Sequence, residues 1–151
     1  MGQAVTQDTN DKKQLLPMIT AVTTQSGDTP TQVLADAGYC SEASLTAVAD
    51  LPVEAFVSTR KQKHGERPSP CPRGRIPQAA TVVERMTRKL QTKAGASVYA
   101  LRKTMVEPVF GQIKEARGFR RFLLRGYAKV QAEWSLVCTT HNILKLYRLC
   151  L

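Results

Sequence analysis

Residues 32–59 read QVLADAGYCSEASLTAVADLPVEAFVST, and this stretch sets the fold class. The runs 32–37 and 54–59 are short and apolar and are bounded by turn residues, which predicts two buried strands. Between them, Ser41 is a suitable N-cap for a helix that runs to about Leu51. The order strand, helix, strand predicts parallel strands joined by a helical crossover, with active-site groups at the carboxyl ends of the strands.

Helical patterns lie on both sides of this stretch, at residues 10–24, 81–93, 97–116 and 127–151. Pro108 and Gly111 lie inside the third pattern and predict a kink near Glu107. The last pattern has one apolar stripe that we expect to face the core, formed by Val130, Trp134, Val137, Cys138, His141, Leu144 and Tyr147. The expected class is α/β with a helix-rich C-terminal half.

The charge of +10 is unevenly distributed. Residues 1–56 carry seven acids against two lysines, a balance of −5, while residues 57–151 carry 20 bases against five acids, a balance of +15. A basic half of this kind favours a polyanionic partner, most commonly nucleic acid, although a basic surface with no single partner is the alternative. Within it, residues 60–77 are rich in proline, glycine and bases and predict a flexible basic loop.

The four cysteines lie far apart with no CxxC pair and no secretory signal before them, which is typical of a reducing cytoplasm. No stretch approaches the 18 or more apolar residues of a membrane span, so no membrane partner is expected. A zinc site would have to combine residues whose spacing matches no ligand motif, namely His64, Cys71, Cys138 and His141.

Residues 99–114 read YALRKTMVEPVFGQIK and combine an acid with bases. In a helix, Tyr99, Lys103 and Glu107 are four residues apart and Lys114 is seven further on, so all four would share one face. This arrangement suits phosphoryl transfer, in which a carboxylate holds a divalent cation and nearby bases position the phosphate.

Asp36, near the end of the first predicted strand, is the other acid that fits this chemistry. Two-metal phosphoryl transfer needs several carboxylates around two Mg²⁺ ions that are about 4 Å apart. The alternative for Asp36 is a turn acid after a strand, and the alternative for Glu107 is a solvated helix acid paired with Lys103.

Three segments resemble DDE-type insertion-sequence transposases. VLADAGYCSE (33–42) is similar to their second-aspartate motif, VEPVFGQIKEARGFRRFLLRG (106–126) to their glutamate motif, and VTQDTNDKKQLLPM (5–18) to the stretch after their first core strands. The resemblance covers nearly the whole chain and implies a ribonuclease-H-like fold whose acids bind Mg²⁺ or Mn²⁺ for DNA cleavage and strand transfer. It implies that Asp36 is the second acid and Glu107 the last.

The resemblance also implies DNA contacts by Tyr99, Lys103 and Lys114. The usual arginine of the family's glutamate motif is displaced by one position in this chain. Four residues separate Arg102 from Glu107, whereas three residues separate Lys103 from Glu107. Either base can serve a phosphate, although lysine lacks the bidentate fork of arginine.

A second group of bases follows the glutamate motif. Four arginines cluster near Phe119 and Phe122, namely Arg117, Arg120, Arg121 and Arg125. Bases interleaved with aromatic residues can grip a DNA backbone and stack on bases. Core packing of the two phenylalanines is the alternative.

Members of this family supply their first catalytic aspartate upstream of the point where this chain begins, and Asp8 and Asp11 follow that position in the motif order. We therefore expect residues 1–151 to be a single partial catalytic domain, an incomplete ribonuclease-H-like fold without its first core strands and inactive alone. Its expected partners are DNA and an intact transposase or a second copy. The alternatives are a noncatalytic DNA-binding fragment that modulates an intact transposase and a decayed reading frame.

Overall fold

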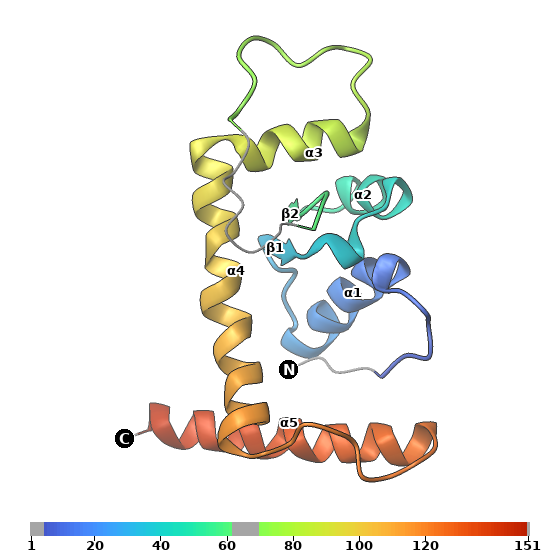
Figure 1. Cartoon of the computed structure of the whole chain (residues 1–151), viewed down its shortest axis with the longest axis vertical. Coiled ribbons are helices and arrows are strands. Elements are labelled where there is room, and N and C mark those ends of the chain that lie inside the picture. Colours follow the sequence, from blue (N-terminus) through green and yellow to red (C-terminus); the bar gives the residue numbers. More distant parts are fainter. Residues whose placement is uncertain (1–4, 62–69, 151) are drawn as a thin grey trace. The chain divides into compact units, whose positions relative to one another are not determined.

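A computed structural model describes residues 5–61 and 70–150 (Figure 1). The elements follow in the order η1 (Asp11–Lys13), α1 (Leu15–Ser26), β1 (Gln32–Ala35), η2 (Ala37–Tyr39), α2 (Glu42–Ala49), β2 (Glu54–Val57), α3 (Val82–Gln91), α4 (Lys93–Gly111), η3 (Gln112–Ala116) and α5 (Tyr127–Leu149). The turns η1 and η2 are 3-10 helical, and η3 is π-helical. The chain forms two compact units, which we call the strand unit (Thr9–Arg102) and the C-terminal unit (Lys103–Leu151 with the described residues of Met1–Asp8).

The strand unit contains a two-stranded parallel sheet. Gln32 of β1 lies opposite Glu54 of β2, and Ala35 lies opposite Val57. Helix α2 connects the strands, which confirms the predicted strand, helix, strand order and a mixed α/β class in a mostly helical chain. Each strand ends two residues earlier than predicted, and after β1 the reason is that Asp36 caps the turn η2.

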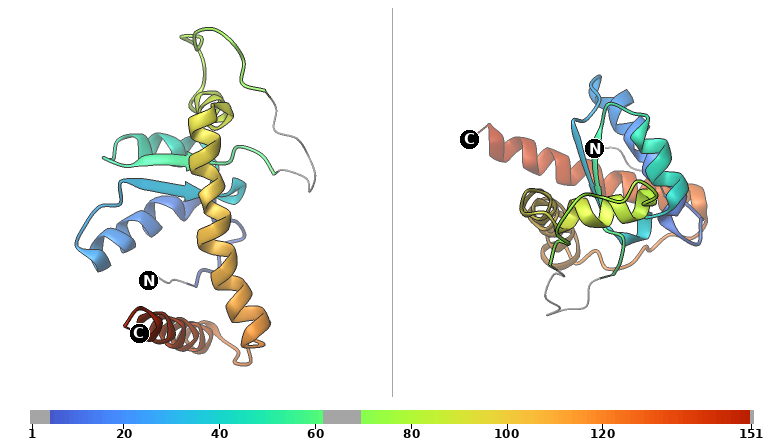
Figure 2. Two further views of the ribbon diagram at one scale, coloured as in Figure 1. Left: turned by 90° about the vertical axis from the view of Figure 1, so that its left-hand side faces the viewer. Right: turned by 90° about the horizontal axis from the view of Figure 1, so that it is seen from above.

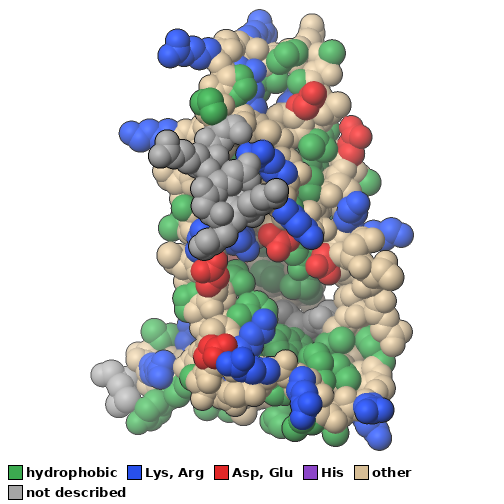
Figure 3. Space-filling model, in the orientation of Figure 1, with side chains coloured by type: hydrophobic (Ala, Val, Ile, Leu, Met, Phe, Trp, Pro, Cys, Tyr) green, Lys and Arg blue, Asp and Glu red, His purple; other side chains and the backbone are tan. Residues whose placement is uncertain are grey.

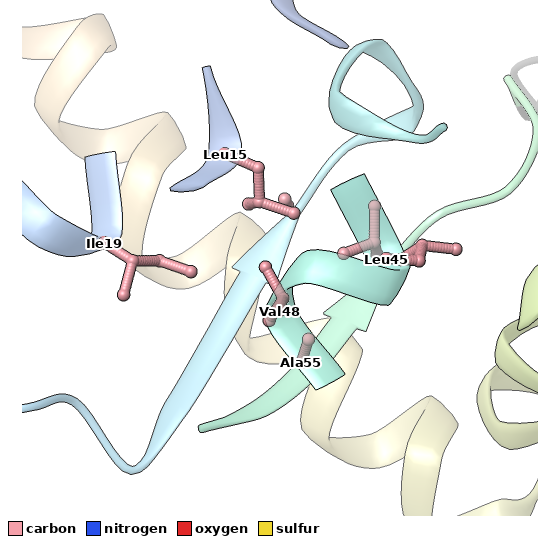
Figure 4. Packing of buried hydrophobic residues seen from close by; sticks show 7 residues of the cluster. Leu15, Ile19, Leu45, Val48 and Ala55 are labelled. Atoms are coloured by element: carbon pink, nitrogen blue, oxygen red, sulfur yellow. The ribbon is translucent and has the colours of Figure 1, made fainter. Parts of the chain in front are cut away.

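One apolar cluster covers a face of this sheet. Leu15 and Ile19 of α1 pack with Val48 of α2 and Val57 of β2, and all four side chains are at most 4% exposed. Figure 4 shows Ile19 and Val48 in this cluster, and Figures 1 and 2 show α1 and α2 on the same side of the strands. Removing this apolar surface from water is the main force that holds the helices to the short strands.

The helix ends follow signals that can be read from the sequence. Ser41 accepts a hydrogen bond from the Ser44 amide at the start of α2. Thr81 and Glu84 form a capping box at the start of α3, which satisfies two backbone N–H groups reciprocally. Gly27 ends α1 with a φ of 80°, a left-handed conformation that glycine adopts without steric cost.

The corner between α3 and α4 is tighter than the sequence suggested. Helix α4 begins at Lys93, four residues before the predicted start. A Cβ atom at Gly95 would lie 2.0 Å from the carbonyl oxygen of Lys89, so the corner has no space for a side chain at this position. The Thr92 hydroxyl accepts the Gly95 amide N–H at 3.0 Å and closes the turn.

Helix α4 continues through Pro108 to Gly111, although proline removes one helical hydrogen bond. The irregularity that we predicted near Glu107 instead follows the helix, in the π-helical turn η3. There the Arg117 amide donates to the carbonyl of Gln112, five residues back, at 3.1 Å. Lys114 lies in this wider turn, so the α-helical spacing that would place it on the same face as Glu107 does not apply to it.

The predicted stripe of α5 is buried only in its middle. Cys138 and His141 are 3% and 5% exposed, whereas Tyr147, which we also expected to face the core, is 62% exposed. The core prediction is therefore wrong for Tyr147, because the described residues of the C-terminal unit do not extend over the last turns of α5. No helix in the described part of the chain is long and apolar enough to cross a membrane.

Of the predicted basic loop at 60–77, the structure describes residues 60–61 and 70–77, and residues 62–69 lie outside the described residues. Residues 70–77 form neither helix nor strand. Arg88 of α3 donates hydrogen bonds to the carbonyls of Pro72 and Gly74, so α3 holds the second half of this loop.

Lys89 links α3 to β2. Its ammonium lies 3.0 Å from the Glu54 carboxylate, donates to the carbonyl of Ala55 at 3.0 Å and lies 3.9 Å from the centroid of the Phe56 ring. Hydrogen bonds from Lys89 and from Gln32 lower the pKa of the Glu54 carboxyl group.

We predict that Leu15→Ala lowers the free energy of unfolding by about 2–5 kcal/mol, because it removes buried methyl groups and leaves a cavity. The matched control is Leu16→Ala in the same turn of α1, where the leucine is 38% exposed. This change should cost under about 1 kcal/mol. Urea denaturation measures both, and equal losses would contradict the packing of α1 described above.

We also predict a pH dependence from Glu54. A carboxyl group whose pKa is lower in the folded state stabilises the fold above its unfolded pKa, and this stabilisation is lost as the pH falls through the folded pKa. At pH 7 the Glu54→Gln variant should therefore have a lower urea midpoint than the unmodified chain, and the difference should shrink on acidification. In a Lys89→Met background the same substitution should show little of this dependence, and a full dependence there would contradict the Lys89 contact.

Candidate functional site

Asp36 directly follows β1 and takes part in a turn. Its Oδ1 accepts the Gly38 amide N–H at 2.8 Å and caps η2. A Cβ at Gly38 would lie 3.0 Å from Asp36 Oδ1 and 3.5 Å from Asp11 Oδ2, so two carboxylates flank this glycine. Asp36, the predicted metal ligand, is thus also a turn acid, which is the alternative that the sequence left open. Its side chain is exposed.

Asp11 follows the position of the first catalytic aspartate in the motif order, so we expected no catalytic role for it. Asp11 comes from η1, which packs against η2, and no sequence spacing indicates this contact. Burial raises the pKa of the Tyr39 phenol, and the nearby charges of Asp11 and Asp36 raise it further. The carboxylates of Asp11 and Asp36 therefore both act electrostatically on Tyr39, although η1 also contains Lys12 and Lys13.

Glu107 lies on α4 in the C-terminal unit and is exposed. It makes no hydrogen bond or ion pair within residues 5–61 and 70–150, so the pair with Lys103 that was the alternative is not formed. Asp36 and Glu107 belong to different units. In the described ranges no three His, Cys, Asp or Glu side chains gather into a metal-binding group. The zinc combination that the sequence spacing disfavours includes His64, which lies outside those ranges.

The two bases that compete for the signature position have different surroundings. The Arg102 guanidinium lies 5.7 Å from the centroid of the Tyr99 ring, and its buried Nε has no hydrogen-bond partner among the described residues. Lys103 is exposed. Arg102 therefore packs on the predicted DNA-contacting tyrosine, while Lys103 is accessible to a phosphate.

Among the basic residues after α4, Arg117 and Arg120 contact other residues of the chain and Arg121 is accessible to a partner. Arg117 donates to the Thr140 hydroxyl at 2.7 Å and to the Thr140 carbonyl at 3.1 Å, which ties η3 to α5. Arg120 forms an exposed ion pair with Glu115. Arg121 is exposed and makes no hydrogen bond or ion pair in the part of the chain that the structure describes.

The loop that carries Arg120 and Arg121 is fixed to α5 by a carboxylate. Glu133 accepts the amide N–H groups of Leu123 and Leu124 at 2.9–3.1 Å. Figure 3 shows basic and apolar side chains intermixed over the lower part of the view, where α5 lies. Residues 103–150 contain nine bases against three acids, so this unit can attract a polyanion.

A family model described as a transposase DDE domain matches residues 72–147, half of the chain. The chain belongs to the DDE transposase domain family. The matched part of this transposase domain contains Glu107 and all the predicted DNA-contacting bases, and it does not extend to Asp36. No curated protein and no solved structure gave a significant match. Members of the family typically use a divalent metal and act on DNA.

We predict that alanine substitutions of Arg117 and Arg121 affect different properties, namely stability and DNA binding. Arg117→Ala should lower the free energy of unfolding by about 1–3 kcal/mol, because it removes charge-assisted hydrogen bonds to α5. Arg121→Ala should change stability by no more than about 0.5 kcal/mol and should weaken DNA binding. Denaturation and DNA-binding titrations measure the two properties separately. An Arg117→Ala variant of unchanged stability would contradict its structural role.

Proposed function

We propose that this chain acts on DNA as part of a transposase catalytic domain, whose reaction is metal-dependent DNA cleavage and strand transfer. The observation that carries the proposal is the transposase DDE domain match over residues 72–147. The exposed acid Glu107 and the accessible bases Lys103 and Arg121 within that range support it. We further propose that β1 and β2 are two parallel strands of a ribonuclease-H-like sheet.

Asp36 and Glu107 are the residues that we propose to hold Mg²⁺ or Mn²⁺. Both are exposed carboxylates, the oxygen donors that these hard cations prefer. A bound cation would supply charge stabilisation at a DNA phosphate. Lys103, Lys114 and Tyr99 would position the DNA backbone next to it, with Arg102 keeping the tyrosine ring in place.

A second candidate function is noncatalytic DNA binding that modulates an intact transposase. The specific observation in its favour is the accessible basic surface of the C-terminal unit, which needs no metal to attract DNA. Two carboxylates are fewer than two-metal phosphoryl transfer usually gathers, so we expect at most weak DNA nicking by the chain alone. Salt-sensitive DNA binding that survives Glu107→Gln would favour this candidate.

The metal proposal is tested by titrating Mn²⁺ into the purified chain in a calorimeter. We predict saturable binding whose affinity falls about tenfold or more in both Asp36→Asn and Glu107→Gln, because each removes a charged ligand. A DNA-nicking assay with Mg²⁺ or Mn²⁺, run on the same variants, reports whether the bound metal is used.

Asp11→Asn is the matched control, since Asp11 lies next to Asp36 but is not one of the proposed ligands. Loss of binding in Asp36→Asn and Asp11→Asn, with Glu107→Gln unchanged, would place the cation at the corner of η1 and η2. That result would contradict the proposed role of Glu107. Binding that is indifferent to all three changes would remove the metal proposal altogether.

A further inference from the structure

The C-terminal unit contains a hollow of about 390 Å³ with aromatic walls. Phe110 of α4 and Trp134 of α5 are nearly parallel, with ring centroids 6.4 Å apart and an angle of 11° between the planes. Phe122 meets Trp134 edge to face at 6.3 Å, and Phe119 meets Phe122 in the same way at 5.5 Å. The size is that of a small-molecule site, and its walls present several aromatic faces and edges to an occupant.

The other lining residues are three cationic side chains and the apolar Val5 and Ile113. Lys114, Arg120 and Arg121 line the hollow, and none of its lining residues is an acid. The Lys114 ammonium lies 5.6 Å from the centroid of the Phe110 ring, so charge and aromatic surface are directly adjacent. Arg120 is paired with Glu115, which leaves Lys114 and Arg121 as the charges without a carboxylate partner in the described part of the chain.

The walls are held in place without an occupant. Glu133 anchors Leu123 and Leu124, the residues that directly follow Phe122. Arg117 ties the turn before Phe119 to α5. A site whose walls are fixed in advance loses less conformational entropy on binding.

The occupant must combine a flat apolar group with negative charge. An unpaired nucleotide has both, because its base stacks on aromatic rings and its phosphates attract Lys and Arg. A base within a duplex is already stacked between its neighbours and cannot enter. An apolar protein segment would fill the hollow but would leave Lys114 and Arg121 without counter-charges.

We propose that this hollow binds one unpaired base of a DNA strand against Phe122 and Trp134, with the flanking phosphates on Lys114 and Arg121. The inference rests on the proposed function, since it deepens the proposed DNA binding by naming the form of DNA that the C-terminal unit accepts. It involves no metal and neither Asp36 nor Glu107. Its consequence is a preference for DNA with unpaired positions over fully paired duplex of the same length.

Trp134 is the only tryptophan of the chain and lies in the wall of the hollow, so its fluorescence reports occupancy. Single-stranded oligothymidylate should quench this fluorescence on binding. An oligonucleotide of the same length whose sites are all abasic carries the same phosphates, and it should bind without comparable quenching. Fully paired duplex should behave like the abasic strand.

Phe122→Leu should weaken binding of the single strand by about 5- to 100-fold, the range that corresponds to one stacked base. Tyr127→Leu is the matched control, because Tyr127 is 47% exposed, close to the 43% of Phe122, and does not line the hollow. This control should keep the affinity of the unmodified chain. Arg121→Ala should weaken binding of the abasic strand as well and reduce the salt dependence by about one phosphate contact.

Equal affinities for the base-containing and abasic strands, with no quenching and no difference between the Phe122 and Tyr127 variants, would overturn the inference and leave the proposed DNA binding intact. Absence of binding to every DNA would overturn both. Quenching by an apolar dye, with none by oligothymidylate, would show that the hollow accepts apolar groups and not an unpaired base, and would also overturn the inference.

Discussion

A pair of four-residue parallel strands cannot be stable alone, so the strand unit depends on the apolar face that the helices cover. Val48 of α2 and Val57 of β2 are essentially inaccessible to water at the centre of this face. They belong to the buried apolar cluster that joins α1 and α2 to the two strands. The crossover α2 lies over the sheet, α1 packs beside it, and the strand β1 ends where Asp36 caps the turn into η2. The position of the candidate metal ligand is thus a consequence of the packing.

The C-terminal unit is held together differently. Few of its side chains are buried, and polar contacts fix its segments to one another. Arg117 donates to the hydroxyl and carbonyl of Thr140 within α5, and Glu133 accepts from the loop that precedes α5. Bases that look alike in the sequence therefore have different roles. Arg117 is a structural residue, Arg120 is neutralised by Glu115, and Arg121 is accessible. Net charge indicates a polyanionic partner, but only the contacts show which bases are available to it.

The sequence predicted the strand order and the cap at Ser41, because these depend on local chemistry and on short periodicities. It did not predict the approach of Asp11 to Asp36 or the hollow around Trp134, which depend on contacts between segments far apart in the chain. The apolar stripe of α5 was extended too far, since periodicity cannot tell where the covering segments end. The roles of Asp36 and Glu107 stay predictions, because the two acids belong to separate units.

The π-helical turn at Gln112–Ala116 makes the length of this segment more important than its composition. A hydrogen bond that spans five residues accommodates one residue more than an α-helical bond does. A deletion of one codon here would restore ordinary α-helical geometry and rotate all that follows by about 100° around the helix axis. Arg117 would then point away from Thr140, and the aromatic walls would separate. Over evolution, positions of this stretch other than the buried Ile113 and the proposed phosphate contact Lys114 should tolerate substitutions far better than insertions or deletions.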